Sequence, residues 1–193
     1  MTRIIAGAAG GRRIDVPPGA TRPTADRARE GLFSTLEALR GPLTTARVLD
    51  LYAGSGAVGL EAVSRGARAV LLVEAGPRAA RVLRGTVRAL GFDRDPARVE
   101  VRVERAERLA RTPAPAAYDV VFADPPYHLA AEALRRVLAD LVGHGWLAAD
   151  ATVVVERASR DAPWSWPSGL VATRSRRYGA GTLWYGRAAR PPD

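Results

Sequence analysis

The sequence predicts an α/β fold with a mostly parallel, seven-stranded sheet. In the middle of the chain, short apolar runs rich in β-branched residues alternate with helical stretches, which is typical of a parallel sheet covered by helices on both faces. Near the C-terminus, two strand-like runs flank Gly179-Ala180-Gly181, which predicts an antiparallel hairpin that closes the sheet. The length of 193 residues accommodates one such domain and a small appendage.

The first 23 residues are predicted to form that appendage, a small β-hairpin arm. Residues 3–6 and 12–16 read as two short strands around a turn rich in glycine and alanine. A helix is expected to follow, with Thr24 as its N-cap, and to run to about Leu39. This organisation divides the chain into an arm, residues 1–23, and a main domain, residues 24–193.

The main domain is expected to contain five buried strands, three further helices and the C-terminal hairpin. The predicted strands are 47–52, 69–74, 98–103, 118–123 and 152–156, the helices lie near 58–64, 78–90 and 131–142, and the hairpin pairs 170–178 with 182–187. Right-handed crossovers place the carboxyl ends of the parallel strands at one edge, where open α/β sheets bind their ligands. Functional residues are therefore expected at these strand ends.

Composition excludes several classes of function. The chain has no cysteine, which rules out a disulfide framework, thiolate metal sites and a cysteine nucleophile. No apolar run is long enough to span a membrane, so a cytoplasmic protein without membrane contact is expected. The protein is also expected to be a monomer. The net charge of +9 comes from arginine alone, and the excess is concentrated in residues 1–40 and 157–193. Such placement indicates a polyanionic partner.

A glycine-rich loop after the first long strand indicates a nucleotide-containing cofactor. The spacing Gly54-x-Gly56-x-x-Gly59 satisfies the dinucleotide fingerprint, and Glu74 ends the next strand, where an acid can accept hydrogen bonds from ribose hydroxyls. The loop alone leaves NAD and S-adenosylmethionine open. Asp50 favours the second, because a carboxylate there would repel a pyrophosphate but hold a cationic amino acid group. The chain also lacks the lysine of a Tyr-x-x-x-Lys dehydrogenase pair.

S-adenosylmethionine is therefore the expected cofactor, and no metal site is expected. Ala106, near the end of the third strand, is predicted to abut the adenine ring. The full set of expected cofactor-binding residues is Asp50, Ala53, Gly54, Ser55, Gly56, Glu74 and Ala106.

The motif Asp124-Pro125-Pro126-Tyr127 follows the fourth buried strand and predicts a slot for a flat ring that bears an amino group. Asp124 and the Pro125 carbonyl can accept hydrogen bonds from the amine, Pro126 stiffens the turn, and Tyr127 offers a face for stacking an extruded base. These four residues are the predicted catalytic residues. Methylation at cytosine C5 normally needs a thiolate, so the acceptor is expected to be an amino nitrogen.

With these motifs, the chain resembles the bacterial methyltransferases that modify a guanine N2 of 16S rRNA. The resemblance is carried by Arg3-Ile4-Ile5, by the signature from Arg22 to Phe33, by the run from Asp50 to Ala62 and by Asp124–Tyr127. It implies a Rossmann-like, S-adenosylmethionine-dependent methyltransferase fold and a 16S rRNA substrate, within a 30S particle or an assembly intermediate. The residues expected to contact RNA are Arg3, Arg12, Arg13, Arg22, Arg27, Arg174, Arg176 and Arg177.

Two alternatives remain open from the residues alone. The same cofactor loop and catalytic motif types occur in DNA amino-methyltransferases, which act on adenine N6 or cytosine N4. A non-catalytic RNA-binding module could also retain this fold. The chain shows no evident separate domain for reading a DNA sequence, which favours the RNA enzyme.

Overall fold

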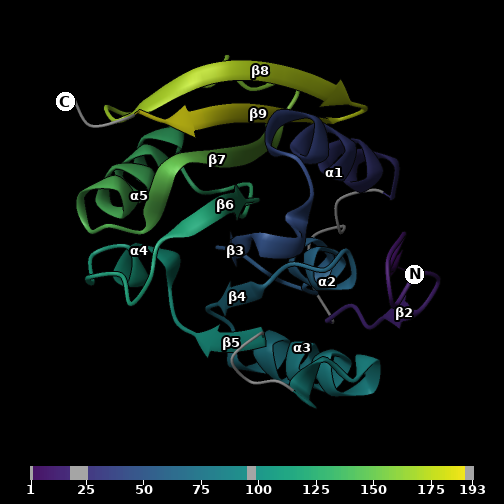
Figure 1. Cartoon of the computed structure of the whole chain (residues 1–193). Coiled ribbons are helices and arrows are strands. Elements are labelled where there is room, and N and C mark those ends of the chain that lie inside the picture. Colours follow the sequence, from purple (N-terminus) through teal and green to yellow (C-terminus); the bar gives the residue numbers. More distant parts are fainter. Residues whose placement is uncertain (1, 18–25, 95–98, 190–193) are drawn as a thin grey trace.

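Figure 1 shows the computed structural model of the chain, which describes residues 2–17, 26–94 and 99–189. A seven-stranded sheet forms its centre, in the order β5-β4-β3-β6-β7-β9-β8. The first five strands in this order pair in parallel, and the last three pair antiparallel, which confirms the predicted fold class. The strands are β3 (Arg47–Asp50), β4 (Ala69–Glu74), β5 (Val99–Val103), β6 (Tyr118–Ala123), β7 (Leu147–Ala158), β8 (Leu170–Tyr178) and β9 (Gly181–Ala188).

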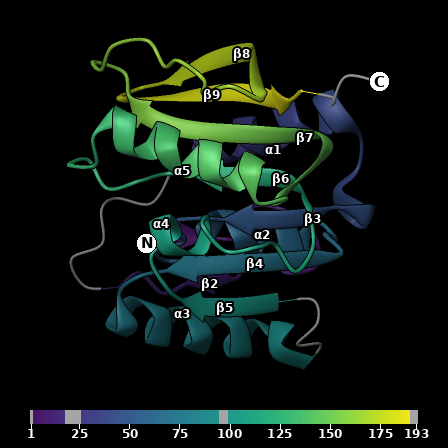
Figure 2. The same cartoon turned by 90° about the vertical axis from the view of Figure 1, so that its left-hand side faces the viewer.

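Helices cover both faces of this sheet, as Figures 1 and 2 show from two directions. One face carries the first three helices and the other carries the last two, and each face has its own apolar core. The helices are α1 (Asp26–Arg40), α2 (Ala57–Ser64), α3 (Pro77–Leu90), α4 (Ala106–Leu109) and α5 (Ala131–Gly143). None of the described helices is both long enough and apolar enough to cross a membrane.

Most of the expected elements are present, with differences at their ends. Strands β4 and β6 have the predicted bounds, whereas β3 ends at Asp50, because Leu51 and Tyr52 already turn into the loop. Strand β7 begins at Leu147, five residues before the predicted start, where it pairs with Tyr118 ahead of an irregularity in the β6–β7 register. Short helices at Leu43–Thr45 and Phe92–Arg94, as well as α4, were not expected. The predicted N-cap Thr24 lies outside the described residues.

The N-terminal hairpin exists but is shorter than predicted. Its strands β1 (Thr2–Arg3) and β2 (Arg13–Ile14) pair antiparallel over two residues each. The predicted strand 3–6 stops early because the backbone N–H groups of Ile5 and Ala6 donate to the carboxylate of Glu61 instead of pairing with β2. The hairpin lies against α2 on the side away from the sheet (Figure 1), and Ile4 and Ile14 belong to the core of that face.

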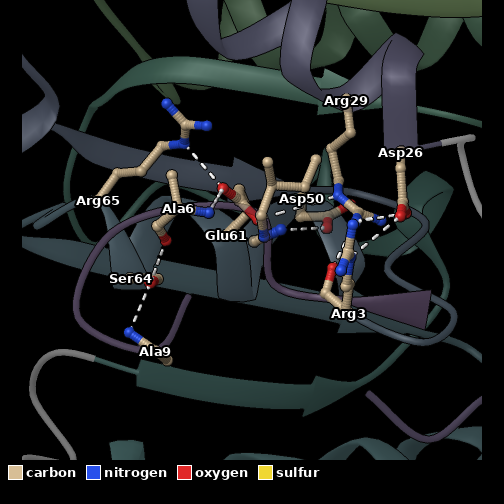
Figure 3. A network of polar contacts seen from close by, with 11 residues as sticks. Arg3, Ala6, Ala9, Asp26, Arg29, Asp50, Glu61, Ser64 and Arg65 are labelled. Carbon is tan, nitrogen blue, oxygen red and sulfur yellow. Dashed lines mark hydrogen bonds and ion pairs between the residues drawn. The ribbon is translucent and has the colours of Figure 1, made fainter. Parts of the chain in front are cut away.

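Glu61 on α2 is the centre of a buried polar network, drawn in Figure 3. Its side chain is fully buried and accepts hydrogen bonds from Ile5 N at 2.7 Å and Ala6 N at 3.0 Å. It also pairs with Arg65 at 2.8 Å and lies 4.0 Å from Arg29. One turn further along α2, the Ser64 hydroxyl accepts from Ala9 N. The hairpin is therefore attached to α2 through polar contacts as well as apolar ones.

Arg29 connects the same network to α1. Its guanidinium is buried, pairs with Asp26 at 3.0 Å and donates to the carbonyl oxygen of Arg3. Burial lowers the pKa of Arg29, while the charges of Asp26 and Glu61 act in the opposite direction. Arg29 on α1 therefore contacts both the hairpin, at Arg3, and α2, at Glu61. Removing a carboxylate partner of this buried guanidinium would leave its charge less well compensated.

Replacing Glu61 tests how much this network contributes to stability. Glu61→Ala removes the acceptor of two backbone N–H groups, the carboxylate partner of Arg65 and one of the two carboxylates beside buried Arg29, so we expect a loss of about 3–5 kcal/mol in the free energy of unfolding. Urea denaturation followed by circular dichroism measures this loss. The matched control is Glu37→Ala, which removes only the exposed partner of Arg65 and should cost less than about 1 kcal/mol. Equal losses in the two variants would contradict this role.

Candidate active site

The glycine-rich loop connects the end of β3 to the start of α2. Leu51 N donates to Phe122 O at 2.9 Å, and Ala53 N donates to Val73 O at 2.9 Å, which ties the loop to the two neighbouring strands. Gly56 N donates back to Ala53 O at 2.6 Å and closes a tight turn. The loop therefore lies at the carboxyl edge of the sheet, as predicted, and the structure places it between β4 and β6.

The three glycines of the motif serve different purposes. Gly56 has a φ of 77°, and a Cβ there would lie 2.3 Å from Leu83 Cδ1, so both backbone and space require glycine. A Cβ at Gly59 would lie 2.2 Å from Leu72 Cδ2, which shows that this glycine lets α2 pack closely on β4. Gly54 has a φ of 53°, and its nearest neighbour would be Tyr52 O at 4.0 Å. The space over Gly54 is open and can accept a ligand.

Glu74 at the end of β4 holds the loop. Its Oε2 accepts from Gly54 N at 2.9 Å and its Oε1 accepts from Gly76 N at 2.7 Å. Each carboxylate oxygen can accept more than one hydrogen bond, so these contacts leave capacity for a ligand hydroxyl.

Asp50 begins the loop, but its carboxylate is only 2% exposed and turns toward α2, where Oδ2 accepts from Gly59 N at 3.1 Å. The pKa of Asp50 is raised to about 7, mainly by burial; the Gly59 hydrogen bond acts against this rise and the charge of Glu74 adds to it. A positively charged ligand in the crevice would stabilise the ionised carboxylate.

The motif Asp124–Tyr127 follows β6 at the same edge of the sheet. Pro125 is buried, whereas Tyr127 is 69% exposed. Leu129 N donates to Pro126 O at 2.9 Å, and Arg157 donates to Leu129 O at 3.0 Å, so the loop is held by a turn and by β7. The structure thus presents an exposed aromatic face close to a half-buried acid, Asp124.

Asp124 lies among other carboxylates. Burial raises its pKa well above the ordinary range, the charges of Glu156 and Asp50 raise it further, and Arg157 lowers it. Asp50 pairs with Phe122 in the parallel register of β3 and β6, so the glycine-rich loop and the Asp124 motif lie side by side at the carboxyl edge of the sheet, where open α/β sheets form their ligand crevice. Glu156, near the end of β7, was not singled out from the sequence, although an acid at the end of a predicted strand was a signal that could have found it.

Tyr178 at the end of β8 faces the N-terminal half of α1. A Cβ at Gly31 would lie 2.0 Å from the Tyr178 hydroxyl oxygen, so the ring rests directly on the helix. The predicted helix signature and the C-terminal hairpin therefore meet on the α1 face of the sheet.

Ala106 lies shortly after the end of β5 at Val103, as predicted, and it opens α4, which was not expected. Its side chain is 2% exposed and belongs to the apolar core with Leu51 and Val73. Among the described residues, no group of three or more histidine, aspartate or glutamate side chains is arranged to hold a metal ion.

The predicted RNA-contacting arginines do not gather in one patch. Arg12 donates to the carbonyls of Ala89 and Leu90 at the end of α3, beside the β5 edge of the sheet. At the opposite edge (Figure 1), Arg174 and Arg176 are exposed on β8.

The other predicted arginines have varied surroundings. Arg3 pairs with Asp26 at 3.6 Å, and Arg177 donates to Gly179 O at 3.2 Å. Arg13 and Arg27 are exposed, and Arg22 lies outside the described residues.

Comparison with known proteins gives consistent matches over nearly the whole chain. The family described as Conserved hypothetical protein 95 matches residues 2–187. The protein named Ribosomal RNA small subunit methyltransferase D of Escherichia coli strain K12 is 38% identical over 156 residues, which is 80% of this chain and 73% of that protein. The Haemophilus influenzae protein of the same name is 31% identical over 178 residues, 92% of this chain and 89% of that protein.

Solved structures agree with this result. The putative methyltransferase yhhF of Escherichia coli superimposes with a TM-score of 0.83 at 29% identity, over 98% of this chain and 99% of that chain. A hypothetical protein of Thermus thermophilus, TTHA0928, superimposes with a TM-score of 0.77 at 31% identity, over 96% and 98% of the two chains.

The buried carboxylate of Asp50 predicts a pH dependence of stability. Because its pKa is higher in the folded state than in the unfolded chain, its contribution to stability is present below about pH 4 and is lost as the pH rises toward about 7. Asp50→Asn keeps an acceptor for Gly59 N but cannot ionise. We therefore expect the free energy of unfolding of this variant to fall less over this pH range than that of the wild type.

Urea denaturation of both proteins between about pH 4.5 and 7.5 measures this difference, at about 1.4 kcal/mol for each unit by which the pKa is shifted. Asp140→Asn, a partly exposed aspartate on α5, serves as the control and should retain the wild-type pH dependence. Parallel curves for Asp50→Asn and the wild type would refute the assignment.

Proposed function

The chain belongs to the family of ribosomal RNA small subunit methyltransferase D, and from this membership and the geometry of the crevice we propose that it transfers a methyl group from S-adenosylmethionine to the exocyclic N2 amine of a guanine in 16S rRNA. The observation that carries the proposal is the shared edge of the sheet: Asp50 pairs with Phe122 in the parallel register of β3 and β6, so the glycine-rich loop starts beside Asp124 and the exposed ring of Tyr127.

The residues of the loop fit this cofactor. The open space over Gly54 accommodates a ligand close to the backbone, and Glu74 has the capacity to accept ribose hydroxyls. The pKa values of Asp50 and Asp124 are both raised, so a cationic ligand beside them would stabilise their ionised forms. S-adenosylmethionine supplies an activated methyl group on a sulfonium. Ala53, Ser55 and Gly56 complete the proposed contacts, and Ala106 is proposed to lie beneath the adenine ring.

Asp124 and its neighbours are proposed to orient the amine. The lone pair of a nucleobase amino group is delocalised into the ring, so hydrogen bonds to the Asp124 carboxylate and the Pro125 carbonyl are needed to aim it. Tyr127 stacks the extruded base, and Pro126 restricts the turn. Positioning is the main catalytic effect, and ionised Asp124 accepts the proton that the amine loses.

The exposed arginines are proposed to hold the RNA backbone. Arg174 and Arg176 on β8, together with Arg27 on α1, flank the face on which Tyr178 meets α1. Contacts of the other predicted arginines, in the hairpin and at Arg177, would extend the surface along the 16S rRNA. Neutralising phosphates with arginine releases counterions and makes the affinity salt-dependent.

Methyl transfer to defined substrates tests the proposed reaction. Undermethylated 30S particles, naked 16S rRNA and duplex DNA are incubated with the protein and tritiated S-adenosylmethionine, and the product nucleosides are identified by mass spectrometry. We expect N2-methylguanosine in ribosomal RNA and no label in DNA. Methylated adenine or cytosine in DNA would replace the proposal by an amino-methyltransferase of DNA, and no transfer at all would indicate a binding module.

Asp124→Asn separates catalysis from binding. The amide keeps the size of the side chain but cannot accept the proton of the amine, so we expect kcat to fall by about 100-fold or more. Cofactor affinity, measured by calorimetry, should remain within a few-fold of the wild type. Asp140→Asn on α5 provides the matched control and should keep full activity. An Asp124→Asn enzyme with normal turnover would disprove the mechanism.

Removing two arginines of β8 tests the RNA surface. The double variant Arg174→Ala with Arg176→Ala should weaken binding to 16S rRNA and reduce the slope of log affinity against log salt by about 0.7–0.9 for each phosphate that is no longer neutralised. Filter binding over a range of salt concentrations measures both. Arg108→Ala with Arg111→Ala removes the same charge from the α4–α5 side of the molecule. If both double variants changed the slope equally, β8 would have no specific role.

A further inference from the structure

Two acidic side chains lie side by side at the carboxyl edge of β6 and β7. Ala123 pairs with Val155 in the parallel register of these strands, so Asp124 and Glu156 each follow a paired residue. Phe122 and Val154, two positions earlier, both belong to the core on the α1 side of the sheet. Because side chains alternate along a strand, Asp124 and Glu156 project to that same side.

The carboxylate of Glu156 lies against a glycine of the neighbouring strand β9. Glu156 is paired with Leu183 of β9, and a Cβ at Gly181 would lie 2.8 Å from Glu156 Oε1. The carboxylate therefore extends over a glycine, where another residue type would crowd it. Gly181 in turn pairs with Tyr178, whose ring rests on α1. Glu156 is thus placed between the proposed amine slot at Asp124 and the aromatic contact of the hairpin with α1.

The amino-bearing bases differ in what lies beside the amine. In guanine, the N2 amine is adjacent to N1–H, so two hydrogen-bond donors stand next to each other. In adenine and cytosine, the ring nitrogen beside the Watson–Crick amine is an acceptor. Two neighbouring carboxylates match two neighbouring donors, whereas a ring acceptor facing an ionised carboxylate would be repelled and left without a partner.

We propose that Glu156 is the specificity-determining residue that reads guanine, accepting a hydrogen bond from its N1–H while Asp124 holds the N2 amine. This inference rests on the proposed guanine-N2 activity and adds to it the group that selects the base. Charge repulsion between the two acids supports their proximity, since Glu156 contributes the largest effect of any charged group on Asp124. A site that pairs with a substrate N–H rejects analogues that lack it by large factors.

2-Aminopurine provides the test, because it keeps the 2-amino group but carries an acceptor at N1. A 16S rRNA is ligated from transcripts and a synthetic segment with guanine or 2-aminopurine at the nucleotide mapped by the methylation assay, and kcat/KM is measured for both. The wild type is expected to prefer guanine by about 100-fold or more. If the wild type has the same kcat/KM for 2-aminopurine and for guanine, the enzyme does not recognise N1–H. The proposal is then refuted by the wild type alone.

Glu156→Gln then identifies the residue responsible. The amide can donate to an acceptor at N1, so the ratio of kcat/KM for guanine over 2-aminopurine should fall by about tenfold or more. 2-Aminopurine also lacks the oxygen at C6, and for this reason the change in the ratio, rather than the ratio itself, is decisive. Glu132→Gln, an exposed glutamate on α5, is the matched control and should leave the ratio unchanged.

The outcomes separate this inference from the proposed function. Equal loss of activity on both bases in Glu156→Gln would mean that Glu156 is merely structural and would overturn the proposal. Should that variant fail to fold, Glu156→Asp is used instead. It keeps the negative charge but shortens the side chain, which moves the carboxylate away from the base, and the ratio of kcat/KM for guanine over 2-aminopurine is again expected to fall. If the wild type forms no N2-methylguanosine on unmodified 16S rRNA, the proposed function itself is wrong, and this is known before Glu156 is considered.

Discussion

The buried carboxylate of Glu61 joins parts of the molecule that are distant along the chain. It fixes the N-terminal hairpin through two backbone N–H groups, reaches α1 through Arg29, and lies on α2, whose first turn receives the glycine-rich loop. Gly59, two residues before Glu61, bonds to Asp50 of that loop. The position of the hairpin and the shape of the cofactor loop therefore depend on the same short helix. A substitution that shifts α2 at Glu61 would also move Gly59, which bonds to Asp50 of the loop.

Acidic side chains at the carboxyl edge of the sheet form a second group of polar residues, whose surroundings differ from those of Glu61 and its partner Arg65. The fold concentrates acidic groups at the ends of β3, β6 and β7 in surroundings that raise the pKa values of Asp50 and Asp124. Strongly shifted pKa values of this kind are characteristic of functional sites, and a positively charged ligand beside these carboxylates would stabilise their ionised forms. The two groups of polar residues are thus complementary: the network on α2 holds the backbone in place, whereas the acidic residues at the strand ends favour a positively charged ligand.

Much of the architecture could be predicted because its signals are local. Strands β4 and β6 are continuous apolar runs, and the glycine spacing and Asp124–Tyr127 each occupy a few consecutive residues. The start of β7 was missed because Leu147-Ala148-Ala149-Asp150 lacks β-branched residues. The role of Arg12 and the burial of Glu61 could not be predicted, since both depend on contacts with residues far away in the sequence. The position of Glu156 beside Asp124 could not be predicted from the sequence, because it depends on the register between β6 and β7.

Strand β8 forms one edge of the sheet, and its residues from Val171 to Arg177 are exposed on both faces. An open edge of this kind presents unpaired backbone groups and is a template for pairing with another chain. Two copies meeting through β8 would bring the arginines at 174, 176 and 177 of both strands into close contact, and their mutual repulsion opposes such a sheet extension. The same side chains that suit a polyanion therefore also protect the protein against edge-to-edge aggregation, so that an evolutionary loss of these charges would endanger solubility as well as RNA binding.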